Sequence, residues 1–304
     1  MSAGSAHTAC SRTWRAVRAR ACASALGLVL TAGAAAQGVE IAAPYVPTAS
    51  SVVERMLEIA EVGPGDYVID LGSGDGRIVI AAASKHGARG LGIEIDPQLI
   101  ALAQRNARAA GVEDRVRFLQ ADLFAADLSR ATVVTIYLLK RATMKLRDDL
   151  LRLKPGTRIV SHAASMGDWP PDHFEMLKVP DRVRPDAPRQ TYLHYWIVPA
   201  AAAGAWRWRA AFGGIVRDYE LSLQQSFQTL SGTVRIGHRQ AKIADGRLRG
   251  ESVTLSFDAA LDGGIVRHQL TGRVTGDSIE GTLQLVAGAD RTELPWRASR
   301  ATTP

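Results

Sequence analysis

The sequence predicts an α/β protein with a Rossmann-like sheet, followed by a small antiparallel β barrel or sandwich. Up to residue 198, short apolar stretches alternate with amphipathic helical patterns, as is typical of a largely parallel sheet with crossover helices. After residue 204 the helical periodicity stops, and short stretches alternate apolar and polar residues between glycine-containing turns. We therefore expect a targeting segment at 1–36, an α/β domain at 37–199, a linker at 200–204 and an all-β domain at 205–304.

Residues 1–36 have the composition of a targeting segment. They hold four arginines and no acidic residue, and an apolar stretch from 21 to 36 ends in three alanines before Gln37. A basic start, a short apolar stretch and small residues at its end are typical of a secretory signal peptide. The stretch is short for a membrane span. We expect an exported or periplasmic protein, with an uncleaved membrane anchor and an organelle transit peptide as open alternatives.

Charge and cysteine content exclude several classes of function. The formal charge of +7, from 37 basic and 30 acidic residues, falls by four to +3 without the arginines of 1–36. Such a small excess does not favour a nucleic-acid partner. Both cysteines, Cys10 and Cys22, lie in the same segment, so the rest of the chain has none. This excludes disulfides, thiolate zinc sites and cysteine nucleophiles from it.

The expected elements of the α/β domain follow one another regularly. Prolines favour an extended stretch over 43–48, and Ser50 or Ser51 is suited to cap a first helix whose apolar residues recur at helical spacing. Strands are expected near 67–70, 89–96, 116–121, 132–138 and 157–162, with helices at 78–84, 97–110 and 143–153. Two more β stretches, 174–179 and 191–198, have no helix between them and add one antiparallel strand.

The all-β domain is expected to contain short, evenly spaced strands. Dipeptides such as Ser231-Gly232 and Asp245-Gly246 mark turns between them. The alternating stretches are 206–212, 219–225, 230–236, 252–257, 267–274, 278–286 and 294–298. This spacing favours a small barrel or sandwich.

A glycine turn after the first strand is the strongest chemical signal. Asp70 precedes Gly72, Ser73, Gly74 and Gly76, and a helical stretch follows. Glycines allow positive φ and a close approach of backbone N–H groups to a ligand, and a helix N-terminus adds unpaired donors. Dinucleotide-binding proteins place their third glycine one residue later, where this chain has Arg77. An acid before the turn suits a charged amine, and the spacing resembles motif I of class I methyltransferases that use S-adenosylmethionine.

Two further acids end the next strands. Glu94 follows Gly76 by 18 residues, the place of an acid that accepts hydrogen bonds from ribose hydroxyls. Asp96 is its nearby competitor, and a solvated carboxylate is the alternative interpretation. Asp122 ends the third strand and is expected at the adenine amino group, with Leu123 against the ring. A capping role for Asp122 stays open.

The chain resembles a particular methyltransferase family over residues 43–165. Pro44-Tyr-Val-Pro-Thr48 precedes the glycine turn of 70–79, and Gly92-x-Glu94, Pro97-x-Leu99 and Ala121-Asp-Leu123 follow. This pattern resembles the mitochondrial protein-lysine methyltransferases of the ATP synthase c subunit and the adenine nucleotide translocase, with their prokaryotic relatives. The resemblance implies a class I methyltransferase fold, S-adenosylmethionine as cofactor, a protein lysine as methyl acceptor, and Tyr45 and Thr48 beside the cofactor.

Candidate acceptor residues follow the fourth and fifth strands, where open α/β sheets bind ligands. They are Tyr137, His162, Asp168 and Trp169. A hydrogen-bonded core histidine and a loop-packing tryptophan are the structural alternatives. The fourth strand lacks the Asn/Asp-Pro-Pro-aromatic motif of methyltransferases that act on adenine, cytosine amino groups or glutamine amides. Two other functions stay open: a small-molecule methyltransferase, and a non-catalytic envelope binding protein on a methyltransferase scaffold.

Overall fold

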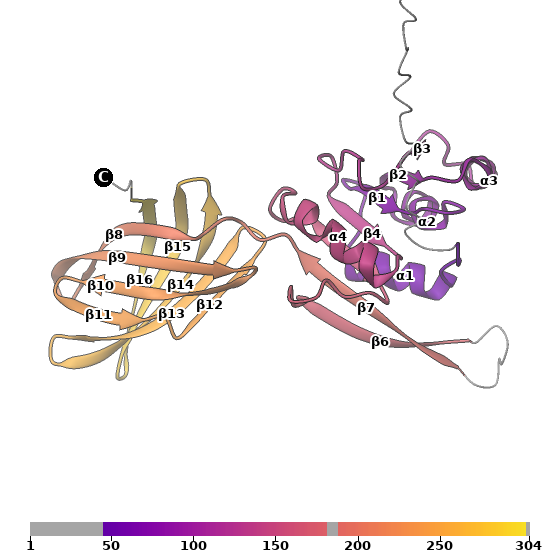
Figure 1. Cartoon of the computed structure of the whole chain (residues 1–304). Helices are drawn as coiled ribbons and strands as arrows, with labels where there is room; N and C mark the ends of the chain where they lie inside the picture. Colours follow the sequence, from indigo (N-terminus) through magenta and orange to yellow (C-terminus); the bar gives the residue numbers. More distant parts are fainter. Residues whose placement is uncertain (1–44, 181–187, 302–304) are drawn as a thin grey trace, which may run out of the picture. The chain divides into compact units, whose positions relative to one another are not determined.

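The computed structural model describes residues 45–180 and 188–301 (Figure 1). The expected targeting segment, 1–36, lies outside the described residues. Within the described ranges, no helix combines the length and apolar character needed to cross a membrane.

The first domain is built on a seven-stranded sheet with the order β3-β2-β1-β4-β5-β7-β6. Its strands are β1 (Tyr67–Leu71), β2 (Arg89–Glu94), β3 (Val116–Gln120), β4 (Val133–Ile136), β5 (Arg158–His162), β6 (His173–Val179) and β7 (Arg189–Ile197). The first five run parallel, and β7 pairs antiparallel with β5 and with β6. This arrangement confirms the predicted Rossmann-like α/β fold of class I methyltransferases.

Alternating strand residues divide the core into two layers. The helices are α1 (Ser50–Ile59), α2 (Arg77–His86), α3 (Pro97–Ala109) and α4 (Lys140–Leu151). Apolar residues of α1 and α2 pack on one face of the sheet against Val68, Val133 and Val160. Residues of α4 pack on the other face, against strand neighbours such as Ile69 and Ile159. Because both faces are covered, binding chemistry is confined to the ends of the strands.

Two helix starts show what the sequence could and could not predict. Asp96 caps α3 by accepting from the Gln98 amide at 2.7 Å, and Pro97 takes the first helical position, as expected. Helix α4 begins at Lys140, three residues before the predicted start, because the chain turns helical directly after Leu139 without a side-chain cap. The sequence carries no capping signal for that turn.

The second domain is an antiparallel barrel. Its strands are β8 (Gly204–Phe212), β9 (Ile215–Ser226), β10 (Thr229–Ile236), β11 (Arg239–Lys242), β12 (Asp245–Arg249), β13 (Ser252–Leu261), β14 (Gly264–Thr275), β15 (Ser278–Ala287) and β16 (Asp290–Arg300). Pairing of β9 with β10 closes a ring of eight strands, and β11 pairs with β10 outside the ring. The sequence prediction missed β11 and β12, which are four and five residues long and rich in charged side chains.

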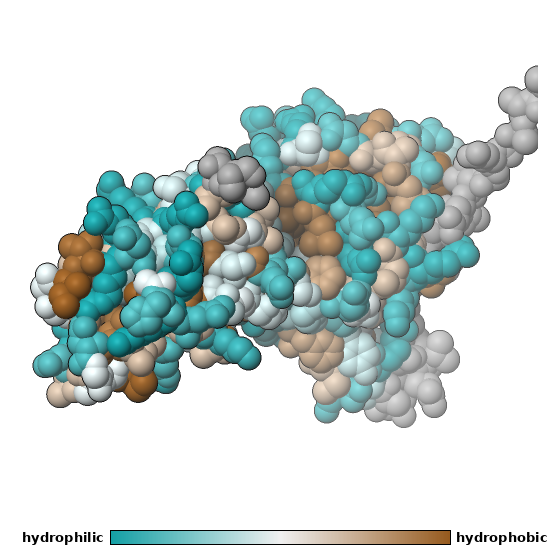
Figure 2. Space-filling view, turned by 60° about the vertical axis from the view of Figure 1, so that its left-hand side comes forward, coloured by the Kyte–Doolittle hydropathy of each residue, from teal (hydrophilic) through white to brown (hydrophobic). Residues whose placement is uncertain are grey.

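Large aromatic side chains fill the barrel. Trp206, Trp296, Tyr219 and Phe257 are fully buried in its core. The Tyr219 hydroxyl lies 3.2 Å from Nε2 of buried His268, which joins β9 to β14 through the interior. On the face shown in Figure 2, hydrophilic residues cover much of the barrel, with some exposed hydrophobic residues among them.

The residues before β8 are fastened to the barrel. The side-chain oxygen of Gln225 accepts from the Ala202 amide at 2.8 Å, and its amide group donates to the Ala200 carbonyl at 2.9 Å. The ring nitrogen of Trp206 donates to the Ala202 carbonyl at 2.9 Å. Ala200 and Ala202 belong to the barrel core, so this part of the expected linker, 200–204, packs with the barrel.

Candidate functional site

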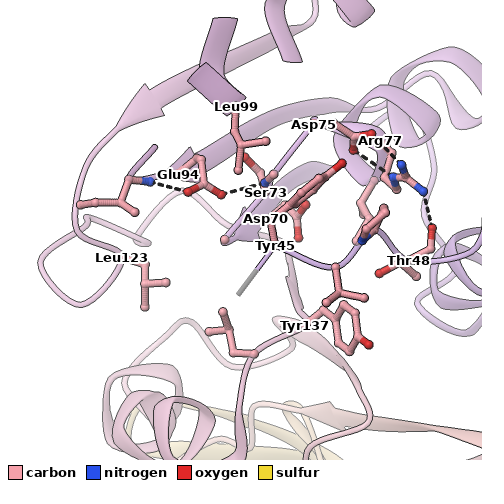
Figure 3. Close-up of a pocket in the computed structure, with 17 residues that line it drawn as sticks. Tyr45, Thr48, Asp70, Ser73, Asp75, Arg77, Glu94, Leu99, Leu123 and Tyr137 are labelled. Carbon is pink, nitrogen blue, oxygen red and sulfur yellow. Dashed lines mark hydrogen bonds and ion pairs between the residues drawn. The ribbon is translucent and has the colours of Figure 1, made fainter. Parts of the chain in front are cut away.

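A cavity lies at the carboxyl ends of β1, β2 and β4 (Figure 3). It contains about 700 Å³ of empty space, part of which is open to solvent. Of the residues singled out in the sequence, nine line it: Tyr45, Thr48, Asp70, Gly72, Ser73, Gly74, Glu94, Leu123 and Tyr137. The sequence therefore located most of the residues that surround this cavity.

The glycine turn has the backbone geometry that its sequence predicts. Gly72, Gly74 and Gly76 have φ of 76°, 53° and 80°. A Cβ on Gly74 would lie 2.6 Å from the Tyr45 ring, and one on Gly76 would lie 2.6 Å from Phe118. Positive φ and tight packing thus both require glycine here. Gly76 does not line the cavity; it stands at the N-terminus of α2.

The amides of the turn are used differently from our expectation. The N–H groups of Gly72 and Ser73 both donate to the Ile93 carbonyl, and that of Gly76 donates to Ser73. The Gly74 N–H donates to Glu94 at 2.9 Å. Three of these donors hold the turn against β2 and the fourth closes the turn itself, so none of the four is offered to a ligand as expected.

Asp70 is the buried acid of the site. Its carboxylate is 3% exposed and accepts a hydrogen bond from the Thr135 hydroxyl at 2.7 Å. Burial raises the pKa of Asp70 to about 7, against the opposing effect of the Thr135 hydrogen bond. Repulsion from Glu94 and Asp75 adds to the rise. A positively charged group in the cavity would favour the ionised form of this carboxyl group.

Glu94 links the turn to the end of β2. One carboxylate oxygen accepts from Gly74, and the other accepts from the amides of Ile95 and Asp96 at 2.8 and 3.1 Å. A carboxylate has about four lone-pair positions, so it can still accept a ligand hydroxyl. Asp96 faces its own helix as a cap, which favours Glu94 over its competitor.

The cavity also has an apolar wall and one buried hydroxyl. Ser73 Oγ is buried and has no hydrogen-bond partner within the described protein. The apolar side chains that line the cavity are Ile95, Leu99, Leu123 and Leu138. A buried acid, a ribose-type acceptor and an apolar wall together fit a ligand with an ammonium end and a nucleoside end.

Tyr137 and His162 form a pair at the end of β4 and β5. Their ring centroids are 3.9 Å apart, and only Tyr137 lines the cavity. Behind it, His162 Nε2 lies 2.7 Å from the Thr191 hydroxyl, and its Nδ1 lies 3.5 Å from that of Thr48. Burial, with a smaller effect from Arg189, lowers the pKa of His162 to about 4. This histidine is therefore a neutral, hydrogen-bonded core residue and does not line the acceptor side of the cavity.

Three expected site residues lie away from the cavity. Asp122 is exposed and accepts from the Phe124 amide at 2.9 Å, so it caps a turn. Asp168 is exposed and forms an ion pair with Arg147. Trp169 is 1% exposed, and its ring nitrogen donates to Gln228 at 3.1 Å. All three follow the ends of strands, as expected, but hydrogen bonds and an ion pair direct their side chains away from the cavity.

Arg77 and Asp75 also line the cavity, although no role was predicted for them from the sequence. The Arg77 guanidinium contacts both carboxylate oxygens of Asp75, at 2.9 and 2.6 Å, and donates to the Thr48 carbonyl at 2.6 Å. The sequence Gly-Asp-Gly-Arg could have indicated a role for them, because it places charged residues between and after the glycines of the turn.

Known proteins match the first domain. Residues 70–173 match the family model described as the ANTKMT methyltransferase domain. A protein-lysine N-methyltransferase of Saccharolobus islandicus is 45% identical over 140 residues, which is 45% of this chain and 86% of that protein.

Two further comparisons cover the same part of the chain. The adenine nucleotide translocase lysine N-methyltransferase of Mus musculus is 36% identical over 129 residues, or 42% of this chain; the match spans only 56% of that relative's length. A solved RNA methyltransferase of Salinibacter ruber, in complex with S-adenosyl-L-homocysteine, is 52% identical with a TM-score of 0.46, covering 51% of this chain and 94% of that one.

Proposed function

We propose that this chain, which belongs to the methyltransferase family represented by the ANTKMT domain, transfers a methyl group from S-adenosylmethionine to a protein lysine. One observation carries the proposal for the cofactor. The buried carboxylate of Asp70 lines a cavity that also contains Glu94. These two acids are suited to an ammonium and a ribose of one ligand.

When bound, S-adenosylmethionine supplies a methyl group on a sulfonium, which an amine displaces in line as the N–C bond forms and the C–S bond breaks. Asp70 would hold the ammonium end, and Glu94 would accept from the ribose. Leu99 and Leu123 would exclude water from the base. Because the sulfonium is already a good leaving group, positioning and desolvation supply most of the catalysis.

A lysine acceptor has to lose its proton before it attacks. The apolar rim of the cavity, with Tyr137 and Leu138, favours the neutral amine by desolvation. No general base is then required, and the released proton passes to solvent. The names of the relatives, which are protein-lysine methyltransferases, support a protein lysine as the acceptor.

Two measurements test the proposal. Calorimetry of the full chain with S-adenosylmethionine should show binding in the micromolar range typical of enzyme substrates. Radiolabelled methyl transfer is then followed into separated protein, RNA and small-molecule fractions of a lysate. Label on protein lysine, removed by Asp70→Ala, supports the proposal. The absence of cofactor binding overturns it, and label confined to another fraction overturns the lysine acceptor.

We further propose that residues 1–36 direct the protein out of the cytosol and are then removed. Cell fractionation with N-terminal sequencing of the recovered protein tests this. A start near Gln37 in an exported fraction is the expected result. An unprocessed chain in the cytosol contradicts it.

A further inference from the structure

Arg77 occupies a position that helix electrostatics disfavours. It is the first residue of α2, whose first turn contains no acidic side chain. The N-terminus of a helix carries a partial positive charge, so a cation there is electrostatically unfavourable. A residue that is unfavourable for its own helix often has a structural or functional role in contacts outside that helix.

The guanidinium of Arg77 connects two parts of the cavity wall. It forms a two-pronged ion pair with Asp75, which belongs to the glycine turn. Its remaining amino group donates to the backbone carbonyl of Thr48 at 2.6 Å. Figure 3 shows both contacts beside the ring of Tyr45.

The segment fastened in this way is residues 45–48. All four of its residues line the cavity. The Tyr45 ring packs directly against Gly74, although the side chain is 47% exposed. The segment ends at the start of α1, whose N-cap, Ala49, offers no side-chain hydrogen bond. The bond from Arg77 to the Thr48 carbonyl is among the shortest contacts that hold the segment over the glycine turn.

We propose that Arg77 is a positioning residue that fastens the 45–48 segment to the glycine turn and thereby sets the affinity for the cofactor. This inference rests on the proposed function. Arginine is required because its planar fork reaches a carboxylate and a carbonyl at once. Lysine would keep the charge but has a single nitrogen, which cannot reproduce the two-pronged contact and the bond to Thr48 together.

The test compares Arg77→Lys and Arg77→Gln with the wild-type full chain, with Arg105→Gln on the exposed surface of α3 as the matched control. Titration with S-adenosylmethionine should show about tenfold weaker binding for both Arg77 variants and no change for the control. Hydrogen–deuterium exchange of residues 45–49 should increase in the Arg77 variants, with unchanged exchange in β1 and β4. These two readouts separate positioning from a general loss of stability.

Three outcomes overturn the inference. Full rescue of affinity by Arg77→Lys means that charge alone matters. Unchanged affinity in Arg77→Gln means that the contact to Thr48 is not used. Increased exchange throughout the domain means that Arg77 has only a structural role. If the wild-type protein itself does not bind the cofactor, the proposed function fails instead.

A double-mutant cycle with Tyr45→Ala distinguishes positioning from direct contact with the cofactor. If Arg77 acts through the 45–48 segment, the double variant should bind little worse than Tyr45→Ala alone. Independent losses that multiply would mean that Arg77 touches the ligand directly, and would overturn its assignment as a positioning residue.

Discussion

The two domains contain buried polar side chains in different surroundings. In the α/β domain, Asp70 and Ser73 are buried at the wall of a cavity, and the Ser73 hydroxyl has no partner within the described protein. In the barrel, Tyr219 and His268 are buried equally deeply, but they bond to each other across an interior filled with aromatic rings. Burial of polar groups therefore identifies a site only where the groups converge on space that a ligand can enter.

The largest expected effect concerns Asp70. Because this buried acid lines a cavity, we expect it to favour ligand binding and to lower the stability of the fold. Asp70→Asn should weaken S-adenosylmethionine binding by at least about 100-fold, since it removes a hydrogen-bonded charge. The same variant should be more stable than the wild type at high pH. Its amide oxygen can still accept from Thr135, and no buried charge remains.

The stability gain of Asp70→Asn should depend on pH. The pKa of Asp70 is about 7 in the folded protein and near 4 in the unfolded chain, so the folded state binds this proton more tightly. The carboxyl group is therefore least destabilising below pH 4, and its cost grows as the pH rises from 4 towards 7 and above. The stability of the variant relative to the wild type should therefore rise by about 2–3 kcal/mol between pH 5 and pH 8. Thermal unfolding at the two pH values measures it, and an equal difference at both would contradict this account.

The glycine turn allows a second test in which strain and packing are separated. Gly74→Ala places a Cβ against Tyr45 at positive φ, so cofactor binding should weaken by about tenfold or more and stability should fall by about 1–2 kcal/mol. Gly111→Ala is the matched control. Gly111 has φ of 66°, but a Cβ there would have no neighbour within 4 Å. The control should lose similar stability and keep full cofactor affinity, as measured by calorimetry.

In the barrel, we expect a substitution of a buried polar residue to change stability without changing cofactor binding. Tyr219→Phe removes the hydroxyl that faces His268 Nε2 and should lower stability by about 1–3 kcal/mol, because a buried polar atom loses its partner. Cofactor affinity should stay unchanged. A loss of affinity in this variant, with the α/β domain still folded by hydrogen exchange, would show that the barrel core takes part in binding.

The smallest expected effect is the loss of stability at acidic pH caused by one buried histidine in each domain. Burial lowers the pKa of His162 and of His268 to about 4, below the value near 6.5 of the unfolded chain. The unfolded state then binds these protons more tightly, so each histidine's contribution to stability is present above pH 6.5 and is lost as the pH falls towards 4. Each should cost about 1 kcal/mol at pH 5.5. Acid unfolding of His162→Gln and His268→Gln, compared with wild type, measures the two separately.

The fold and the cofactor side of the site could be predicted because local patterns determine them. Glycines at alternate positions set the turn after β1, and strand ends bring Asp70 and Glu94 to one edge. The direction of a side chain at such an edge depends on neighbours distant in sequence. Trp169 turns into the core, where its ring N–H donates a hydrogen bond to Gln228, a residue 59 positions away in the sequence.

The acceptor side was harder to predict for the same reason. His162 was a candidate by position, yet its partners Thr48 and Thr191 come from elements on either side of it in the chain. Arg77 was visible in the sequence, but its role depends on a backbone carbonyl 29 residues earlier. A backbone acceptor leaves no sequence signal at all.

The contacts of Gln225 have a consequence for the ancestry of the chain. Because Ala200 and Ala202 are part of the barrel core, and Trp206 depends on the Ala202 carbonyl, the unit that could be transferred between genes begins before β8. A fusion joined at residue 204 would replace Ala200 and Ala202, whose side chains belong to the barrel core. The smallest barrel able to move as a module thus includes the alanine-rich stretch that, in sequence, resembles a mere spacer.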